Sequence, residues 1–311
     1  MYDSNIRHQV ATSQAVENGL RAVPLSQPPV VCREIETKDL EELATLLTEG
    51  FPSRDRSYWL YGLGIMQARF EGGTSRPLGY VLVSNDQLVG VLLTIHSPDD
   101  ANGVKGRCNL SSWYIEPEYR GAAIALERLA TADPALTYTS ISPAPHTRRL
   151  MSVLRHRSLN EDALLALPTL APIKRDARIQ PYSAQHHDRL LSPDMARICS
   201  DHKDLDCIVL IAQTQAGAHP FIFQKRPLTA LKTGCADIIF SPSDDLLSGL
   251  AGPLGRFLLR QGIFLWKLEA RTHLKGVPYW SFTGKAPRLV KGAGVTLAND
   301  LTYSELVVFG P

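Results

Sequence analysis

The chain contains 311 residues, of which 44% are hydrophobic and 21% are charged, and its formal net charge is +2. This length suits two domains of about 150 residues each, and the apolar content is sufficient for real hydrophobic cores. The near-neutral charge and the lack of a basic tract argue against nucleic acid as a partner. The lack of a run of about 18 apolar residues argues against a membrane span.

The cysteine and histidine patterns do not favour a metal site. The five cysteines form no C-x-x-C pair, which predicts mostly buried, reduced thiols in a cytoplasmic protein. His186-His187 and His202 have no Cys, Asp or Glu partners at ligand spacing, so no metal is expected. Residues 1–30 are polar, lack the apolar core of a signal peptide and are predicted to form a flexible N-terminal arm.

A short strand and two helices are expected next. The strand is Val31–Ile35, and the first helix opens at Asp39 and ends at Gly50. Its apolar residues at helical spacing are Leu40, Leu43, Leu46 and Leu47. The second helix, Tyr58–Phe70, has an aromatic face that is typical of core packing.

Several strands follow. Gly79–Ser84 and Leu88–His96 are β-rich runs joined at Asn85-Asp86, which predicts a hairpin. Asn109–Ile115 is a third strand. Further on, Thr137–Ser142 is predicted as a strand, and a helix is predicted at Thr147–Leu154.

The segment after Ile115 has the pattern of an anion site. Pro117 and Gly121 interrupt the chain, and a helix then starts with the small residues Ala122, Ala123 and Ala125. The first N–H groups of a helix are free to donate, and the helix dipole favours negative charge. An ordinary connection between a strand and a helix has the same pattern, so both interpretations stay open.

The sequence from Arg120 to Ala125, RGAAIA, resembles the acyl-CoA-binding motif of the GNAT acyltransferase superfamily, which reads Q/R-x-x-G-x-G/A after an extended strand. Ala123 stands at the position of the first motif glycine, and the methyl group of this alanine narrows the site for the pyrophosphate. Ala125 matches the final Gly/Ala of the motif. The order of predicted elements from Arg33 to Asn160 also resembles that superfamily.

The resemblance implies a mixed α/β fold of the α+β kind, with a mostly antiparallel sheet flanked by helices. It implies direct transfer of an acetyl or other acyl group from acyl-CoA to an amine or hydroxyl of a small-molecule acceptor. No metal is implied, and the aromatic helix Tyr58–Phe70 would form a wall of the acceptor pocket in such a fold. The residues that would bind acyl-CoA by this analogy are Tyr114, Ile115, Arg120, Gly121, Ala122, Ala123, Ile124 and Ala125.

Three residues are candidates for acid–base catalysis in such a protein. Glu116 lies at the end of the central strand, His96 ends the preceding strand and His146 opens the fourth helix. A turn carboxylate and structural histidines are the alternative interpretations. The tyrosine that many GNAT enzymes place on the fourth helix as general acid falls on Leu154, so the usual acid is absent.

The second half repeats the pattern of the first. Strands are predicted at Asp206–Gln213, His219–Lys225, Cys235–Phe240 and Gly262–Glu269, with a loop and helix at Asp244–Gln261. This order predicts tandem GNAT-like lobes at 31–165 and 176–311, joined by a connector near 161–178. Gly249, Gly252 and Gly255 are spaced like a phosphate loop, but Pro253 interrupts them.

Three functions remain open from the sequence. The first is an acyl-CoA-dependent acyltransferase, which the Arg120-Gly121 pair favours. The second is a catalytically silent GNAT-like protein that binds acyl-CoA or a partner, which Ala123 and Leu154 favour. The third is a two-domain binding module whose resemblance is accidental. The sequence leaves the oligomeric state unknown.

Overall fold

The computed structural model describes residues 29–71, 76–101, 106–173, 176–228, 233–269, 274–292 and 300–310. The predicted arm 1–30 lies outside the described residues except for its last two positions. The α-helices are α1 (Leu40–Gly50), α2 (Arg56–Glu71), α3 (Ala123–Ala130), α4 (Pro145–Val153), α5 (Ala184–His187), α6 (Pro193–Asp204), α7 (Asp244–Leu259) and α8 (Glu305–Val308). The strands are β1 (Val31–Glu34), β2 (Gly79–Ser84), β3 (Gln87–His96), β4 (Arg107–Ile115), β5 (Thr137–Ser140), β6 (Arg157–Ala166), β7 (Arg178–Pro181), β8 (Ile208–Thr214), β9 (Gly217–Leu228), β10 (Thr233–Phe240), β11 (Ile263–Glu269) and β12 (Tyr279–Lys291).

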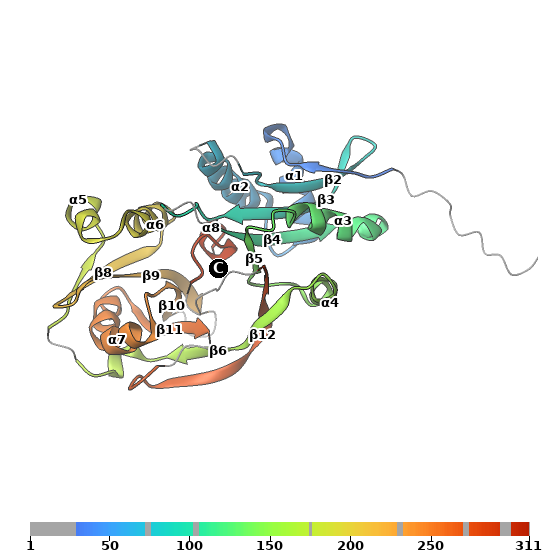
Figure 1. Cartoon of the computed structure of the whole chain (residues 1–311). Helices are drawn as coiled ribbons and strands as arrows, with labels where there is room; N and C mark the ends of the chain where they lie inside the picture. The colour runs from blue at the N-terminus through green and yellow to red at the C-terminus, as the bar shows by residue number, and fades with distance from the viewer. Residues whose placement is uncertain are drawn as a thin grey trace, which may run out of the picture.

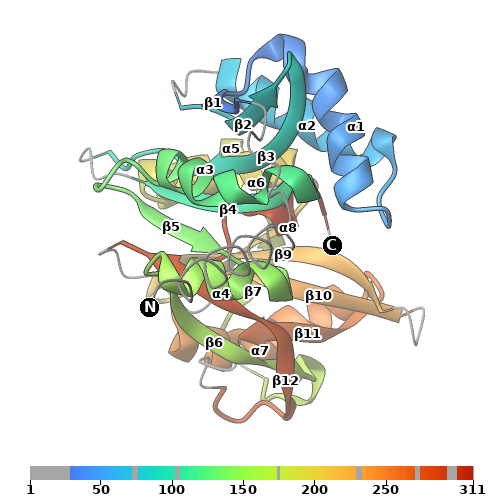
Figure 2. The same cartoon turned by 90° about the vertical axis from the view of Figure 1, so that its right-hand side faces the viewer.

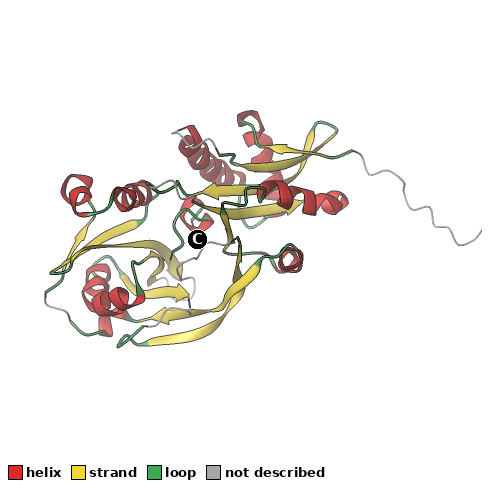
Figure 3. Cartoon of the chain, in the orientation of Figure 1, coloured by secondary structure: helices red, strands yellow, loops and turns green. Residues whose placement is uncertain are grey.

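The described strands form one continuous sheet in the order β1-β2-β3-β4-β5-β12-β6-β11-β10-β9-β8-β7. Among these strands, β4–β5 and β10–β11 are parallel pairs, and the other neighbours are antiparallel. Helices flank this strongly curved sheet (Figures 1 and 3). The predicted mixed, mostly antiparallel α/β fold is therefore confirmed.

The two halves of the chain repeat one order of elements and are interlocked. In each half an antiparallel run of strands ends in a parallel pair, β4–β5 or β10–β11, joined by a helix, α3 or α7. The last strand of each half is inserted toward the other half, because β12 pairs with β5 and β6 pairs with β11. Figure 2 shows the two halves stacked, with α4 and α8 near the level where they meet. Neither half therefore completes its part of the sheet alone.

The prediction of a connector near 161–178 is wrong for residues 161–166. Residues up to Ala166 belong to β6, which pairs with both β11 and β12 in the middle of the sheet. The prolines that indicated a break, Pro168 and Pro172, come just after this strand. A short 3₁₀ helix, Pro168–Leu170, follows it.

The glycines of α7 serve packing. A Cβ atom at Gly252 would lie 2.2 Å from the carbonyl oxygen of Pro172, and one at Gly255 would lie 2.8 Å from Pro168. The segment after β6 therefore packs directly on this helix, which real Cβ atoms would prevent. The phosphate-loop interpretation of these glycines is wrong, because they lie inside a continuous helix that runs through Pro253.

The helices of the first half pack on opposite faces of the sheet. One core contains Leu43 and Leu47 of α1 with Val91 and Leu93 of β3. A separate core contains Leu92 of β3 with residues of β4, α3 and α4. Because neighbouring residues of a strand point to opposite faces, α1 and α2 cover one face and α3 and α4 cover the other.

The predicted hairpin and first helix are confirmed. Asn85 and Asp86 both have positive φ, 50° and 62°, as a tight two-residue hairpin loop between β2 and β3 requires. The predicted apolar face of α1 is buried at Leu43, Leu46 and Leu47.

Candidate active site

The parallel strands β4 and β5 pair over a short length and then diverge. Arg107–Asn109 pair with Thr137–Thr139, after which β5 ends at Ser140 while β4 continues to Ile115. A β-bulge lies on the free part of β4, where Ser112 and Trp113 together oppose Leu92 of β3, and Ser112 has a φ of 50°. The edge of β4 beyond Asn109 is thus open toward a space that β5 does not fill.

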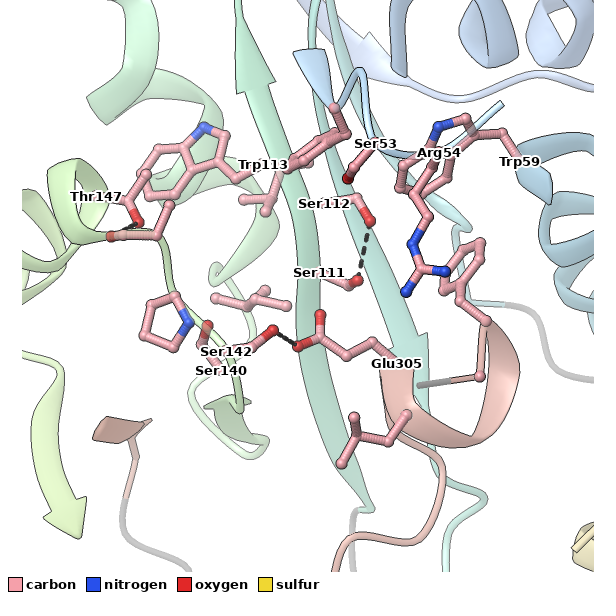
Figure 4. Close-up of a pocket in the computed structure, with 18 of the residues that line it drawn as sticks. Ser53, Arg54, Trp59, Ser111, Ser112, Trp113, Ser140, Ser142, Thr147 and Glu305 are labelled. Carbon is pink, nitrogen blue, oxygen red and sulfur yellow. Dashed lines mark hydrogen bonds between the residues drawn. The ribbon is translucent and has the colours of Figure 1, made fainter. Parts of the chain in front are cut away.

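A cavity of about 350 Å³ lies at this opening. In the first half its wall is formed by the α1–α2 loop, α2, β3, β4, β5, the β5–α4 loop and α4. In the second half it is formed by β9, α8 and the residues that follow α8. Five serines line it, namely Ser53, Ser111, Ser112, Ser140 and Ser142. Its charged side chains are Arg54, Arg226 and Glu305. Figure 4 shows the serines and Glu305 gathered around β4.

Glu305 is held at the point where the two strands diverge. Its backbone N–H donates to Oδ1 of the buried Asn109 over 3.0 Å, and Nδ2 of Asn109 donates to the carbonyl oxygen of Thr139 over 3.1 Å. The hydroxyl of Ser142 donates to Oε1 of Glu305 (Figure 4). One asparagine therefore links α8 to both parallel strands and fixes the carboxylate in the cavity wall.

The environment of Glu305 favours its protonated form. Burial raises the pKa of this carboxyl above its ordinary value, although hydrogen bonds from Ser142 and Ser111 oppose the shift. A carboxylate whose pKa is raised accepts a proton more readily near neutral pH. Such groups, with a charge or hydrogen-bond partner in a cleft, are typical of functional sites.

Aromatic side chains close the cavity beside α2. Trp59 packs against the rings of Phe51 and Phe309, each with 5.5 Å between ring centroids. Phe309 also occupies the space above Gly62, where a Cβ atom would lie 2.1 Å from its ring. This contact docks the segment after α8 on the first half. The guanidinium of Arg54 lies 4.5 Å from the centroid of the Tyr58 ring.

No protein-family model matches the chain, and no curated protein matches its sequence. A GCN5-related N-acetyltransferase from Anabaena variabilis has a TM-score of 0.53 and 12% identity over 84% of this chain and 72% of that chain. A probable N-acyltransferase from Enterococcus faecalis has a TM-score of 0.54 and 13% identity over 88% of this chain and 73% of that chain.

The chain has the fold of the GCN5-related N-acetyltransferases. A further GCN5-related N-acetyltransferase, from Sphaerobacter thermophilus, has a TM-score of 0.50 and 13% identity. The match covers 88% of this chain and 100% of that chain. The predicted resemblance is therefore confirmed at the level of the fold.

The three predicted catalytic residues of this GNAT fold lie outside the cavity wall. Glu116 precedes the 3₁₀ helix Pro117–Ala122, and burial, followed by the charges of Glu49 and Glu118, raises its pKa. His96 pairs with Cys108 at the far end of β4 and lines a separate small cavity, and burial lowers its pKa to about 4. His146 is exposed on α4, next to Thr147, which does line the cavity.

The residues predicted to bind acyl-CoA lie where β4 leads into α3. Pro117–Ala122 form a 3₁₀ helix that continues directly into α3, and the N–H group of Ala123 donates to the carbonyl oxygen of Arg120. The expectation of a free amide is therefore wrong at Ala123, because a 3₁₀ turn uses it. Of the remaining predicted residues, Arg120, Gly121, Ile124 and Ala125 are exposed, Ala122 is partly buried and Ile115 is buried.

Two aromatic residues of β4 point to different faces. The ring of Tyr114 packs over Gly50, where a Cβ atom would lie 2.4 Å from it, so this side chain faces α1. Trp113 packs against the same core on the α3 face as Ala122 and Ala123, and it also lines the cavity. In Figure 4 its indole points from β4 toward Thr147 of α4. Trp113 thus connects the cavity with the start of α3.

Glu305 and Arg226 are cavity residues that no sequence pattern indicated. Glu305 follows a serine and lies far along the chain from β4, so no local motif indicates it. Tyr58 lies on the aromatic helix that was predicted, and burial raises its pKa. Leu154, at the position of the usual acid, follows the last turn of α4 and is not one of the cavity residues.

Neither a metal-binding cluster nor a membrane-spanning helix is present among the described residues. No group of three or more His, Cys, Asp or Glu side chains in that part of the chain is arranged to hold a metal ion. Within the same residues, no helix has the length and apolar character needed to cross a membrane.

Proposed function

We propose that the protein is an acyl-CoA-dependent acyltransferase whose site is the cavity between β4 and β5. The observation that carries this proposal is the divergence of the parallel pair at Asn109, with a carboxylate of raised pKa fixed at the point of divergence. A thioester between the two strands and an acceptor beside Glu305 would be held for direct transfer.

Glu305 is proposed as the proton acceptor. The acceptor nitrogen or oxygen attacks the thioester carbonyl carbon, the new bond forms, the C–S bond breaks and the proton passes to the carboxylate. Tyr58 lines the same cavity. Its hydroxyl is proposed to protonate the leaving thiolate in place of the tyrosine that is missing at position 154. Ser142 holds the carboxylate through its hydrogen bond.

The donor is proposed to lie on the face of the sheet covered by α3 and α4. The positive end of the α3 dipole and the exposed guanidinium of Arg120 suit the diphosphate, and Trp113 leads from there to the cavity. This assignment keeps the predicted residues from Arg120 to Ala125. It does not depend on the amide of Ala123, which is already bonded within the chain.

We infer that the second half is a second GNAT-like lobe that completes the acceptor site without binding a donor of its own. The repeated order of elements supports two lobes. Beyond Asp237, the edge of β10 pairs with the segment at Asp300–Leu301, where the N–H group of Leu301 donates to the carbonyl oxygen of Ile239 over 2.7 Å. That segment occupies the place where a second donor would enter.

A catalytically silent acyl-CoA-binding protein is the second candidate. The closed 3₁₀ turn at Ala123 and the leucine at position 154 favour it. Release of thiol from acetyl-CoA in the presence of a panel of small amines distinguishes the two. The acyltransferase predicts amine-dependent thiol release, and the silent protein predicts calorimetric binding of acetyl-CoA with no release.

The variant Ala123→Glu tests the donor position. A carboxylate at the start of α3 would repel the diphosphate, so binding of acetyl-CoA is expected to be lost. Leu129→Glu, on an exposed position of the same helix, is the matched control and is expected to bind normally. Unchanged affinity in Ala123→Glu would place the nucleotide elsewhere.

A further inference from the structure

A buried carboxylate fastens the helix α3 to the sheet. Glu127 lies four residues after Ala123, about 6 Å further along the helix axis. Its side chain has no exposed surface, and Leu126 and Ala130 are the other buried side chains of this helix. An ionised carboxylate is costly to bury unless cations and hydrogen-bond donors compensate it. The partners of Glu127 therefore determine how α3 sits on the sheet.

These partners come from both halves of the chain. Oε1 of Glu127 accepts hydrogen bonds from Nε2 of His156 over 2.8 Å and from Nζ of Lys291 over 2.7 Å. His156 follows α4 in the first half, whereas Lys291 ends β12 of the second. Lys291 also donates to the hydroxyl of Thr131, just after α3, over 2.8 Å. Among the described residues, Oε2 of Glu127 has no partner, so the carboxylate is held through one oxygen.

The end of β12 also contacts the wall of the cavity. Leu289 pairs with Ser140 of β5, and Lys291 pairs with Tyr138 of the same strand. Ser140 lines the cavity where the thioester is proposed to lie. The backbone of Lys291 is thus fixed on β5, while its ammonium group holds α3. Because a short helix moves as one unit, loss of this contact would let the first turn of α3 shift relative to the cavity.

We propose that Lys291, acting through Glu127, is a positioning residue for the donor, because it sets the distance between the diphosphate site on α3 and the opening between β4 and β5. This inference rests on the proposed function. The diphosphate and the thioester are parts of one molecule, so both sites are engaged together only at a matching spacing. Lys291 supplies the constant positive charge, since His156 is charged only when protonated.

The test compares two thioesters that differ in the diphosphate. Acetyl-CoA carries it, whereas S-acetylpantetheine has the same thioester and arm without the diphosphate and nucleotide. Binding of each is measured by calorimetry for the wild-type protein, Lys291→Met, Lys291→Arg, Glu127→Gln and the double variant of Lys291→Met with Glu127→Gln. The control Lys275→Met loses the same charge from an exposed pair with Asp245 of α7.

The effect is expected only for the ligand with the diphosphate. In Lys291→Met and in Glu127→Gln, the affinity for acetyl-CoA should fall about 10-fold, the size of a lost hydrogen bond to a charged group. The affinity for S-acetylpantetheine should stay unchanged. The double variant should lose no more than either single variant, because both remove one contact. Lys291→Arg should retain most of the affinity, and Lys275→Met should bind as wild type.

Three results would overturn the proposal. An equal loss for both thioesters would mean that Lys291 serves the general stability of the protein. Unchanged binding of acetyl-CoA in Lys291→Met would mean that α3 keeps its place without this contact. Tighter binding in Glu127→Gln would mean that Lys291 acts on the diphosphate directly. If a single variant does not fold, the double variant, which leaves no unpaired buried charge, is compared with the wild type.

The binding measurements do not depend on turnover, so failure of the acyltransferase function gives a separate result. The expected pattern without thiol release would support Lys291 as the positioning residue of a silent acyl-CoA-binding protein. Thiol release without the pattern would leave the acyltransferase in place and overturn the role of Lys291. Equal affinity of the wild-type protein for the two thioesters would show that the diphosphate is not bound, and would overturn the proposal as well.

Discussion

The two parallel strand pairs of the chain have the same place in the topology and different surroundings. β4 and β5 diverge after Asn109, and the opening is a cavity with a fixed carboxylate. β10 and β11 pair as far as Asp237 and Lys267, and Asp300–Leu301 then take up the free edge of β10. One opening in this fold is available to a ligand, and the chain itself fills the other.

The difference between the two strand pairs indicates what each half contributes to the cavity. The first half supplies the open strand pair and most of the cavity wall, and the second half supplies Arg226 and Glu305. Arg107, at the start of β4, donates to Oδ1 of Asp300 over 2.6 Å, so the segment that closes the second pair is also tied to the first. Changes at the cavity are therefore expected to affect catalysis, and changes in the packing of the second half are expected to affect stability.

The largest expected effect is on catalysis in Glu305→Gln. If Glu305 is the proposed proton acceptor, its loss should lower kcat by about 10²- to 10⁴-fold, with acetyl-CoA affinity unchanged. In the wild-type protein activity should rise with pH through the pKa of Glu305, which burial places above its ordinary value. Steady-state thiol release across pH measures both effects. The exposed Glu49→Gln is the control, and a loss equal in both variants would contradict the assignment.

A large loss of stability is expected from Gly252→Ala in the second half. The added Cβ atom would lie 2.2 Å from a backbone oxygen in the segment after β6, so the helix or that segment must shift. We expect the free energy of unfolding to fall by about 1–3 kcal/mol in urea titrations.

Gly64→Ala in α2 is the matched control for that variant. A Cβ atom there meets no atom within 4 Å, so the free energy of unfolding should rise by about 0.5–1 kcal/mol. Equal effects of the two changes would show that α7 is not packed as closely as described.

Much of the fold could be predicted from the sequence where local patterns determine it. The leucines of α1, the Asn85-Asp86 turn and the helix α7 depend on spacing over a few residues, and each was predicted. β6 and β12 were not, because prolines follow the first and charged and polar residues interrupt the second. These two strands exchange between halves, and the pairing of distant strands leaves no periodic signal.

Only the part of the site that a local pattern determines could be predicted. The strand and helix start from Tyr114 to Ala125 resemble a known motif, whereas Glu305 enters the cavity only because α8 folds back against Asn109 and α2. A histidine such as His96 is a candidate because its ordinary pKa is near neutrality, but burial lowers the pKa of this residue to about 4. Position in the fold decides these properties, and the residue type alone does not.

A smaller effect concerns the contact between the halves at Glu127. This buried carboxylate of α3 accepts hydrogen bonds from His156 over 2.8 Å and from Lys291 of β12 over 2.7 Å. Burial raises its pKa, but the two hydrogen bonds and the Lys291 charge outweigh burial, so the pKa is lowered in the folded protein. The ionised carboxylate therefore contributes stability above the ordinary carboxyl pKa.

That contribution is lost as the pH falls below the ordinary carboxyl pKa and through the lowered folded value. Urea unfolding of the wild-type protein at acidic pH should show this dependence, up to about 1.4 kcal/mol per pH unit for one proton. Glu127→Gln should unfold with a weaker dependence on pH over the same interval. An unchanged dependence would mean that Glu127 does not titrate differently on unfolding.

The smallest expected effect is a shift of the pH profile in Ser142→Ala. The Ser142 hydroxyl stabilises the ionised form of Glu305, so its removal should raise the pKa of that carboxyl further. The acidic limb of the activity profile should move to higher pH. Ser140→Ala, in the same cavity wall, should leave the profile in place. A shift to lower pH in Ser142→Ala would contradict the described hydrogen bond.

The most direct test is a crystal structure of the protein with a non-hydrolysable analogue of acetyl-CoA. We predict that the thioether will lie between β4 and β5 near Asn109, with the diphosphate at the start of α3 and the β10–β11 pair closed by Asp300–Leu301. An analogue bound at β10–β11, or on the α1–α2 face of the sheet, would contradict the account.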